Sequence, residues 1–204
     1  MKFISNKIYS YLDLPIPMKL KEEITTGNCL YDNKELLEKL DYNYKGSTLC
    51  RYIRNKVDEQ FINDIVLAVP ELEGHIKDVG LQKTYNECLN PAGSILPPHT
   101  DGSTRGTHCI QWLFDSGGPD VHTTWYIEDM HTALRNPNIA DTRSTNLHPI
   151  KDVIFDTNRW VIFRTNIIHS VQTIYSSREA LTIGFTNDQV FKKIIKKYGI
   201  TGGP

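Results

Sequence analysis

The chain lacks a long run of apolar residues, a pair of neighbouring cysteines and an excess of charge of either sign. No segment approaches the ~20 apolar residues that cross a membrane, and the first residues contain no apolar core of a secretory signal. We therefore expect a cytoplasmic protein that binds no membrane. A net charge of −1 also provides no basic surface for nucleic acid, which leaves a small molecule or a peptide as the expected partner. The sequence indicates no oligomeric state.

The cysteines exclude two common kinds of site. The four thiols stand far apart in the sequence, at Cys29, Cys50, Cys88 and Cys109. No Cys-x-x-Cys pair is present for a structural zinc ion or a redox disulfide. We expect free, buried thiols.

The chain is long enough for one domain with a proper hydrophobic core. Of its 204 residues, 39% are hydrophobic and 23% charged, which is typical of an ordinary globular protein. We expect a single domain over residues 1–204. Its expected parts are a helical or irregular support over 1–75, a β-sheet core over 76–186, and a carboxyl-terminal helix and tail over 187–204.

Hydrophobic periodicity places helices before and after a central group of strands. Apolar stripes at helical spacing predict helices over 32–40, 55–69 and 188–198. Alternating or continuous apolar residues predict strands over 76–89, 107–114, 122–127, 160–165 and 178–185. The polar stretch 129–148 has no such periodicity, which is typical of a functional loop that shapes a substrate pocket.

Two short motifs contain side chains that can bind one metal ion. His99 and Asp101 are two residues apart, and on a strand such side chains point to the same face. His169 closely follows the apolar run 160–165 and can supply a third ligand. Two histidines and one carboxylate occupy one face of an octahedral metal and leave three positions open, which is the arrangement of ferrous oxygenases.

The first motif alone has little weight, because His-x-Asp is expected about half a time by chance in a chain of this composition. The alternative interpretation is a His and an Asp that cap turns at the end of a strand. The second motif favours the metal site, because Arg178 follows His169 by nine residues. Its guanidinium suits a two-pronged grip on a carboxylate.

The strand that begins at Arg178 has two distinct faces. One face carries Arg178, Ala180, Thr182 and Gly184, and the other carries Leu181, Ile183 and Phe185. We expect the turn 174–177 to fold this strand back beside the strand that ends near His169, which would bring the guanidinium close to the metal. The apolar face should pack against the helices.

Together these motifs resemble the iron(II)/2-oxoglutarate-dependent dioxygenases, in particular the prolyl and aspartyl/asparaginyl hydroxylase-like branch. The resemblance is carried by Pro98-His99-x-Asp101, Asn166-x-x-His169-Ser170-Val171 and Arg178-x-x-Leu181-Thr182-Ile183-Gly184-Phe185. It covers roughly residues 81–185, about half of the chain. It implies a mainly β fold, with a double-stranded β-helix (jelly-roll, cupin-like) core and flanking α-helices.

The resemblance also implies cofactors and a reaction. His99, Asp101 and His169 would bind Fe(II), and Arg178 would hold the distal carboxylate of the cosubstrate 2-oxoglutarate. The further candidates for cosubstrate binding are Tyr85, Thr182 and His108; for Tyr85 and His108 the alternative is an ordinary place in the core. With O2, such a site would hydroxylate an unactivated C–H bond of an amino acid, a peptide side chain or a small metabolite, and would release succinate and CO2. No catalytic side chain is expected beyond the metal ligands.

Two other functions fit the same ligands. A zinc hydrolase would use them to activate water, but Arg178 argues against it and the sequence offers no clear acid/base carboxylate. A non-enzymatic cupin-like domain would bind a metal or a ligand without chemistry. Halogenation is disfavoured, because Asp101 keeps the carboxylate ligand that halogenases give up for chloride.

Overall fold

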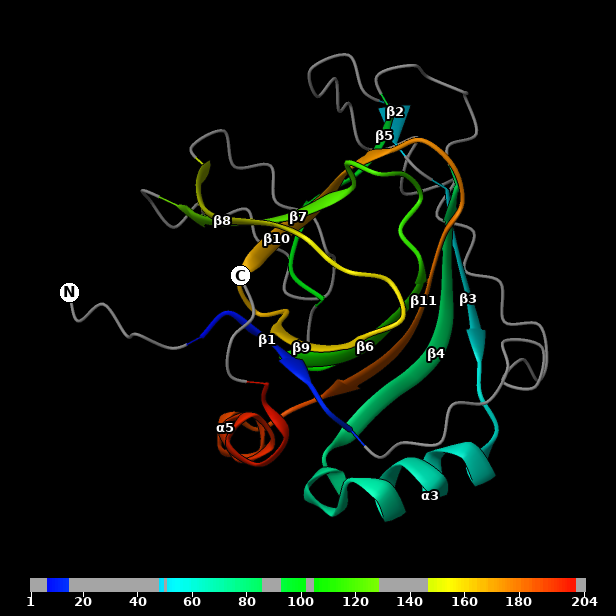
Figure 1. Ribbon diagram of the computed structural model, residues 1–204, viewed down its shortest axis with the longest axis vertical. Helices are drawn as coiled ribbons and strands as arrows, with labels where there is room; N and C mark the ends of the chain where they lie inside the picture. Colours follow the sequence, from blue (N-terminus) through cyan, green and yellow to red (C-terminus); the bar gives the residue numbers. More distant parts are fainter. Residues whose placement is uncertain are drawn as a thin grey trace.

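The computed structural model describes residues 7–14, 48–49, 51–85, 93–101, 105–128 and 147–200, and this part of the chain is mainly β. Its strands form two sheets that face each other (Figure 1). The larger sheet has the order β1 (Tyr9–Leu12), β9 (Trp160–Arg164), β6 (His108–Asp115), β11 (Arg178–Phe185), β4 (Ile76–Tyr85) and β3 (Arg51–Lys56). The smaller sheet has the order β2 (Thr48–Leu49), β5 (Ser94–His99), β10 (Ile168–Ile174), β7 (His122–Glu128) and β8 (Leu147–Ile154).

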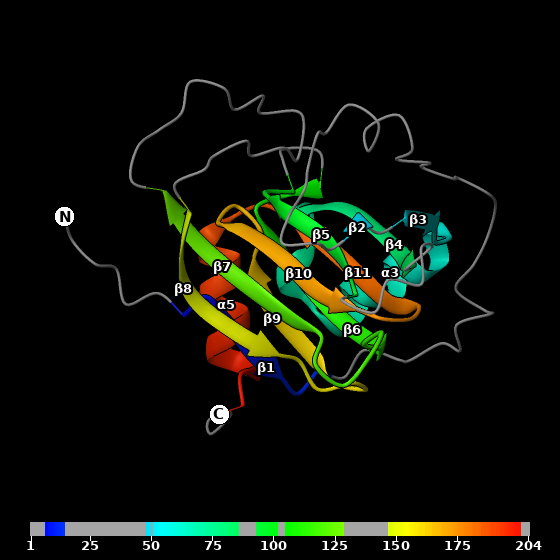
Figure 2. The same ribbon diagram turned by 90° about the horizontal axis from the view of Figure 1, so that it is seen from above.

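From β4 to β11 the chain passes repeatedly between the two sheets. Strands β4, β6, β9 and β11 belong to the larger sheet, whereas β5, β7, β8 and β10 belong to the smaller one. Their pairings within each sheet are all antiparallel. Figure 2 shows the smaller sheet lying over the larger one. This strand order is a double-stranded β-helix, or jelly roll, so the predicted fold class is confirmed.

Two helices cover the outer side of the larger sheet (Figure 1). They are α3 (Glu59–Ala68), followed by the short 3-10 helix η1 (Pro70–Leu72), and α5 (Asp188–Tyr198). One hydrophobic cluster joins their buried side chains to Leu181, Ile183 and Phe185 of β11. The predicted apolar face of this strand therefore packs against the helices, as expected.

Helix α3 begins later than its periodicity predicted. Residues 51–56 form strand β3, which pairs with β4, so a helix from Asn55 was wrong. Asp58 is the N-cap, and its carboxylate accepts a hydrogen bond of 2.6 Å from the backbone N–H of Phe61. Phe61 and Ile65 of the predicted stripe are buried. Packing of this apolar face against the rest of the protein therefore stabilises the helix more than the polar residues of its first turn do.

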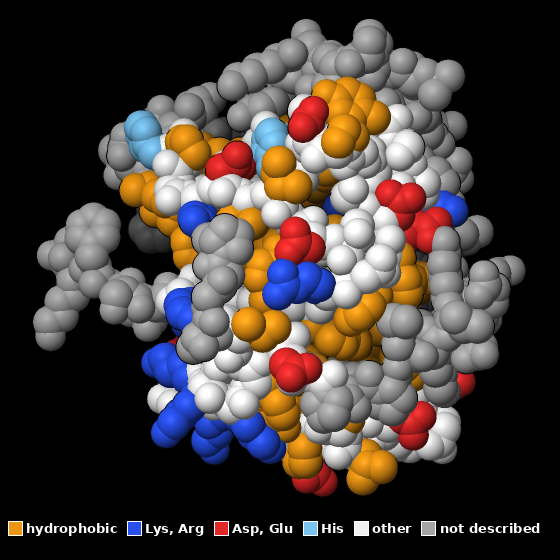
Figure 3. All heavy atoms as spheres, viewed as in Figure 1, with side chains coloured by type: hydrophobic (Ala, Val, Ile, Leu, Met, Phe, Trp, Pro, Cys, Tyr) orange, Lys and Arg blue, Asp and Glu red, His pale blue; other side chains and the backbone are white. Residues whose placement is uncertain are grey.

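Helix α5 matches the predicted range 188–198, and its exposed side carries a cluster of positive charge. Figure 3 shows Lys and Arg side chains gathered over this helix. Lys192 and Lys197 make ion pairs of 2.8 Å with Asp188 and Glu71, which is typical of a solvated helix face. None of the helices in the described ranges is both long and apolar enough to cross a membrane.

Strand β11 does not lie beside the strand that precedes His169, so that expectation was wrong. Its neighbours are β4 and β6. β9 lies in the same sheet on the far side of β6, and β10, which contains His169, lies in the other sheet. Strands β1 and β3 extend the larger sheet at its two edges, within the region predicted as helical or irregular support. The predicted helix 32–40 and residues 129–146 of the predicted loop lie outside the described residues.

Candidate metal centre and cosubstrate cavity

The structure brings His99, Asp101 and His169 together. His99 is the last residue of β5 and is the register partner of His169 on β10, with ring centroids 4.5 Å apart. Asp101 lies beyond the strand, where its backbone N–H donates a 3.2 Å hydrogen bond to the Thr165 carbonyl. One potential ligand atom from each side chain lies within 4.8 Å of the other two, so a single metal ion can contact all three.

The second histidine is held with one ring nitrogen available. His169 Nδ1 lies 3.0 Å from the Ile167 carbonyl oxygen, which can only accept a hydrogen bond, so Nδ1 carries the proton. The lone pair is then on Nε2. Burial, reinforced by the charge of His99, lowers the pKa of His169 to about 4, although Asp101 opposes the shift. A neutral imidazole at neutral pH is the form that binds metal.

The carboxylate is kept in its ionised form. Burial acts to raise the pKa of Asp101, but a hydrogen bond from His99 and the charges of His169, His99 and Arg105 outweigh it and hold the pKa below its usual range. The donor set is thus two imidazole nitrogens and one carboxylate oxygen, which line one cavity. This set fits Fe(II) with positions left open for other ligands, and it equally fits a catalytic zinc.

The three ligands share a cavity with Arg178 and Thr182. Its volume is about 580 Å³, part of which is open to solvent. Its polar and charged lining is contributed by both sheets and consists of Asp78, Gln82, His99, Asp101, Arg105, Gln111, Thr123, His169, Arg178 and Thr182. Leu96, Cys109, Phe163 and Val171 form apolar walls, and an apolar wall excludes water and strengthens electrostatic contacts inside.

Arg178 lies at the start of β11 and is only 5% exposed. The neighbouring Glu179 belongs to the other face of the strand and pairs with Lys83 at 2.6 Å. The inner face continues through Thr182 to Gly184, where a β-carbon would overlap the carbonyl oxygen of Arg105. Glycine at 184 therefore lets the Arg105 segment close over the strand beside the metal ligands.

Sequence reasoning missed several residues of this cavity. Tyr85 ends β4 opposite Arg51, and its side chain lies outside the described residues. Gln82, on the same strand, does line the cavity, and so does Gln111 on β6. Position 111 could have been found, because it alternates with Cys109 on the face of β6 opposite Ile110. Asp78 and Arg105 needed the three-dimensional fold.

His108 is not part of the cavity lining. Its ring lies on the opposite face of β6, 2% exposed, against the rings of Phe185 and Phe191 at 5.3 and 4.6 Å. Arg164 donates to His108 Nε2 at 3.4 Å, so the neutral ring carries its proton at Nδ1, 2.8 Å from the Thr107 hydroxyl. These contacts correspond to the core alternative considered for this residue, and we assign it no cosubstrate contact.

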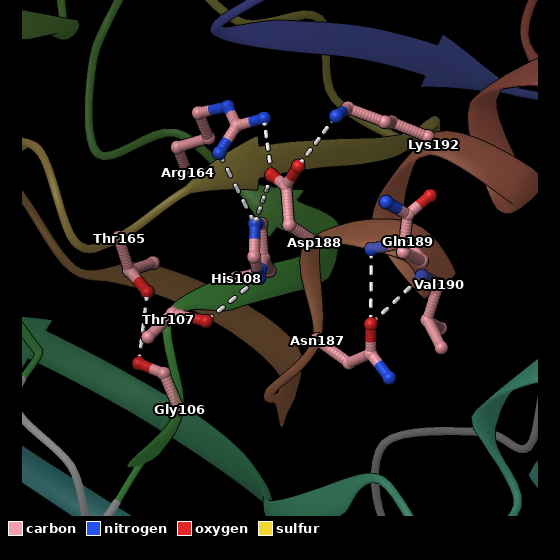
Figure 4. A network of polar contacts seen from close by, with 10 residues as sticks. All are labelled: Gly106, Thr107, His108, Arg164, Thr165, Asn187, Asp188, Gln189, Val190 and Lys192. Carbon is pink, nitrogen blue, oxygen red and sulfur yellow. Dashed lines mark hydrogen bonds and ion pairs between the residues drawn. The ribbon is translucent and has the colours of Figure 1, made fainter.

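The network around His108 ties α5 to the sheet (Figure 4). Asp188, at the start of α5, lies 3.6 Å from His108 Nε2 and 2.6 Å from Arg164 Nη2. Lys192 reaches the other carboxylate oxygen at 2.8 Å. The hydrogen bonds from Lys192 and Arg164 lower the pKa of Asp188 to about 2. This cluster has a structural role in docking the helix.

We expect His108 to make the fold less stable in mild acid. Burial, with a smaller contribution from the Arg164 charge, lowers its pKa from 6.5 to about 4, against the effect of Asp188. Between these two pH values the unfolded chain binds a proton that the folded chain does not. The free energy of unfolding therefore falls as the pH drops from 6.5 towards 4, by up to ~3 kcal/mol for this residue.

Urea unfolding across this pH range, with a chelator present, checks the prediction in wild type and His108→Gln. The variant should lose stability less steeply with falling pH. Some pH dependence should remain in it, because the pKa of His169 is also about 4. Equal slopes for the two proteins would contradict the assignment to His108.

Comparison with known proteins gives a distant result. No family model and no curated protein matches the sequence, but solved structures match the chain. The non-heme alpha-ketoglutarate-dependent epimerase SnoN from nogalamycin biosynthesis is 14% identical, with a TM-score of 0.42 over 71% of this chain and 65% of its own. A Pseudomonas putida prolyl-4-hydroxylase is 13% identical, with a TM-score of 0.37 over 72% and 74%.

A second SnoN structure, in complex with Fe3+, alpha-ketoglutarate and nogalamycin RO, is 13% identical, with a TM-score of 0.39 over 81% of this chain and 76% of its own. In the first match this chain spans just under two thirds of the epimerase's length. The fold is assigned from the strand order of this chain, and the site from the geometry of its own residues.

Proposed function

We propose that the chain is an iron(II)/2-oxoglutarate-dependent dioxygenase that hydroxylates an unactivated C–H bond of an amino acid, a peptide side chain or a small metabolite. Succinate and CO2 would be the coproducts. The observation that carries the proposal is that His99, Asp101 and His169 converge in one cavity with the buried Arg178. A zinc hydrolase gives no reason for a buried guanidinium at that place.

Each part of the site has a task in this proposal. The two imidazoles and the carboxylate bind the metal on one side and leave the cavity side open. Arg178 provides a fixed pair of donors for a carboxylate. Phe163, Val171 and Leu96 exclude water. The metal, when bound with 2-oxoglutarate and dioxygen, supplies the oxidising chemistry, and the protein supplies orientation.

The test is an anaerobic titration of the metal-free protein with Fe(II) and then with 2-oxoglutarate. We expect the weak visible charge-transfer band of a 2-oxo acid chelated to iron, followed by formation of succinate when O2 is admitted. A well-folded protein that binds Fe(II) but produces no band with 2-oxoglutarate would favour the non-enzymatic cupin-like alternative.

A further inference from the structure

One residue that lines the cavity has a buried amide donor with no partner among the described residues. Gln111 lies on β6, is 4% exposed and lines the cavity. Its Nε2 atom is buried and makes no hydrogen bond within the described part of the chain. Buried amide donors are almost always satisfied in folded proteins, because an unsatisfied one keeps its full desolvation cost. An acceptor on a bound ligand would satisfy this one.

The position of Gln111 indicates which acceptor it meets. Its register partner on β11 is Thr182 and its partner on β9 is Val161, so it stands in the middle of the larger sheet. Thr182 lies on the same strand face as Arg178, four residues along. That separation is roughly 13 Å between Cα atoms, and the long Arg178 side chain lies in the same cavity. A carboxylate bound by the Arg178 guanidinium can therefore lie within the cavity at the height of Gln111 on the sheet, where the Gln111 amide could contact it.

Thr182 also lies in the cavity, but it is less suited than Gln111 to donate a hydrogen bond to this carboxylate. Its hydroxyl donates a hydrogen bond of 3.3 Å to the Gly80 carbonyl oxygen. A carboxylate has only acceptor atoms, so the single hydroxyl proton of Thr182 would have to leave Gly80 to reach it. The Gln111 amide needs no such exchange.

We propose that Gln111 donates a hydrogen bond to the distal carboxylate of the 2-oxo dicarboxylate that Arg178 holds. The inference rests on the proposed function and extends it to specificity. A neutral amide in the same cavity as a guanidinium keeps the cavity attractive to a carboxylate, whereas a second carboxylate at this position would repel it. Gln111 is thus a ligand-binding residue that distinguishes a dicarboxylate from a monocarboxylate.

The test is isothermal titration of the Fe(II)-loaded protein under anaerobic conditions. It compares wild type with Gln111→Leu, which removes the donor, and Gln111→Glu, which replaces it with a charge of similar shape. The ligands are 2-oxoglutarate and 2-oxopentanoate, which has the same carbon chain without the distal carboxylate. Gln189→Leu, at an exposed position of α5, is the matched control. Fe(II) affinity and circular dichroism are measured for each protein.

We expect Gln111→Leu to weaken 2-oxoglutarate about tenfold or more, as for loss of a hydrogen bond to a charged group. Gln111→Glu should weaken it further, while 2-oxopentanoate binding and Fe(II) affinity stay unchanged in both. Unchanged 2-oxoglutarate affinity in Gln111→Leu would overturn the inference, and so would an equal loss for both ligands. If the wild-type protein binds Fe(II) but no 2-oxoglutarate, the proposed function itself is wrong. That result is obtained from the wild type alone, before any variant is compared.

Discussion

His169→Ala should weaken Fe(II) binding by more than about a hundredfold and remove the 2-oxoglutarate-dependent absorption band altogether. His169 offers Nε2 to the metal because Nδ1 is committed to the Ile167 carbonyl. Loss of a hydrogen-bonding partner of a metal ligand already costs 10–100-fold in affinity, so loss of the ligand itself should cost more. The remaining pair, His99 and Asp101, leaves the ion open on too many sides to fix a chelating cosubstrate.

The measurement is a competition titration with a chromogenic chelator, under anaerobic conditions, for wild type, His169→Ala and His148→Ala. His148 is an exposed residue of β8, so its replacement controls for the general loss of a histidine. His169 is 5% exposed, so its removal leaves a small void that could destabilise the fold. Circular dichroism therefore checks that the variant is folded. A folded His169→Ala protein with wild-type iron affinity would refute the three-ligand site.

Strand patterns in the sequence predicted the faces of the elements well. The alternation over 178–185 placed Arg178 and Thr182 towards the cavity and Leu181 towards the helices, and both placements are found. A period of two residues is a local property of an extended chain with one polar and one apolar side. The jelly-roll class followed from the motif resemblance, and the strand order confirms it.

Patterns could not predict which strands are neighbours. The turn after Ile174 reads the same whether the next strand joins the same sheet or crosses to the other one. In the structure it crosses, and β11 pairs with β4, about a hundred residues earlier in the chain. Such long-range pairing depends on the burial of whole faces, which no local window contains.

The same limit applies to the site. The three metal ligands could be proposed because their chemistry is distinctive and their motifs are short. Gln111 and Gln82 carry no such signal, since glutamine is common on exposed strands and only the closed fold shows that these two face a cavity. His108 is the opposite case. Its imidazole is a potential ligand-binding group close to the metal motif in sequence, but in the structure it packs against α5.

Arg178→Leu should weaken 2-oxoglutarate binding by about a hundredfold or more while leaving Fe(II) affinity unchanged. A buried guanidinium binds a carboxylate through two charge-assisted hydrogen bonds, each worth about 1.5–3 kcal/mol, and a leucine provides neither. Arg178→Lys should lose about tenfold, because an ammonium keeps the charge but not the planar pair of donors. Arg159, which pairs with Asp156 at the surface, provides the control Arg159→Leu.

The effects on Fe(II) binding and on 2-oxoglutarate binding separate the role of Arg178 from that of His169. His169→Ala should abolish metal and cosubstrate binding together, whereas Arg178→Leu should affect the cosubstrate alone, since its guanidinium is no metal ligand. Titration of 2-oxoglutarate and 2-oxopentanoate into the Fe(II)-loaded proteins measures this directly, because only the first ligand has a distal carboxylate to lose. If Arg178→Leu binds 2-oxoglutarate as wild type does, the carboxylate is held elsewhere. Arg105, the other arginine of the cavity lining, would then be the expected partner of the distal carboxylate.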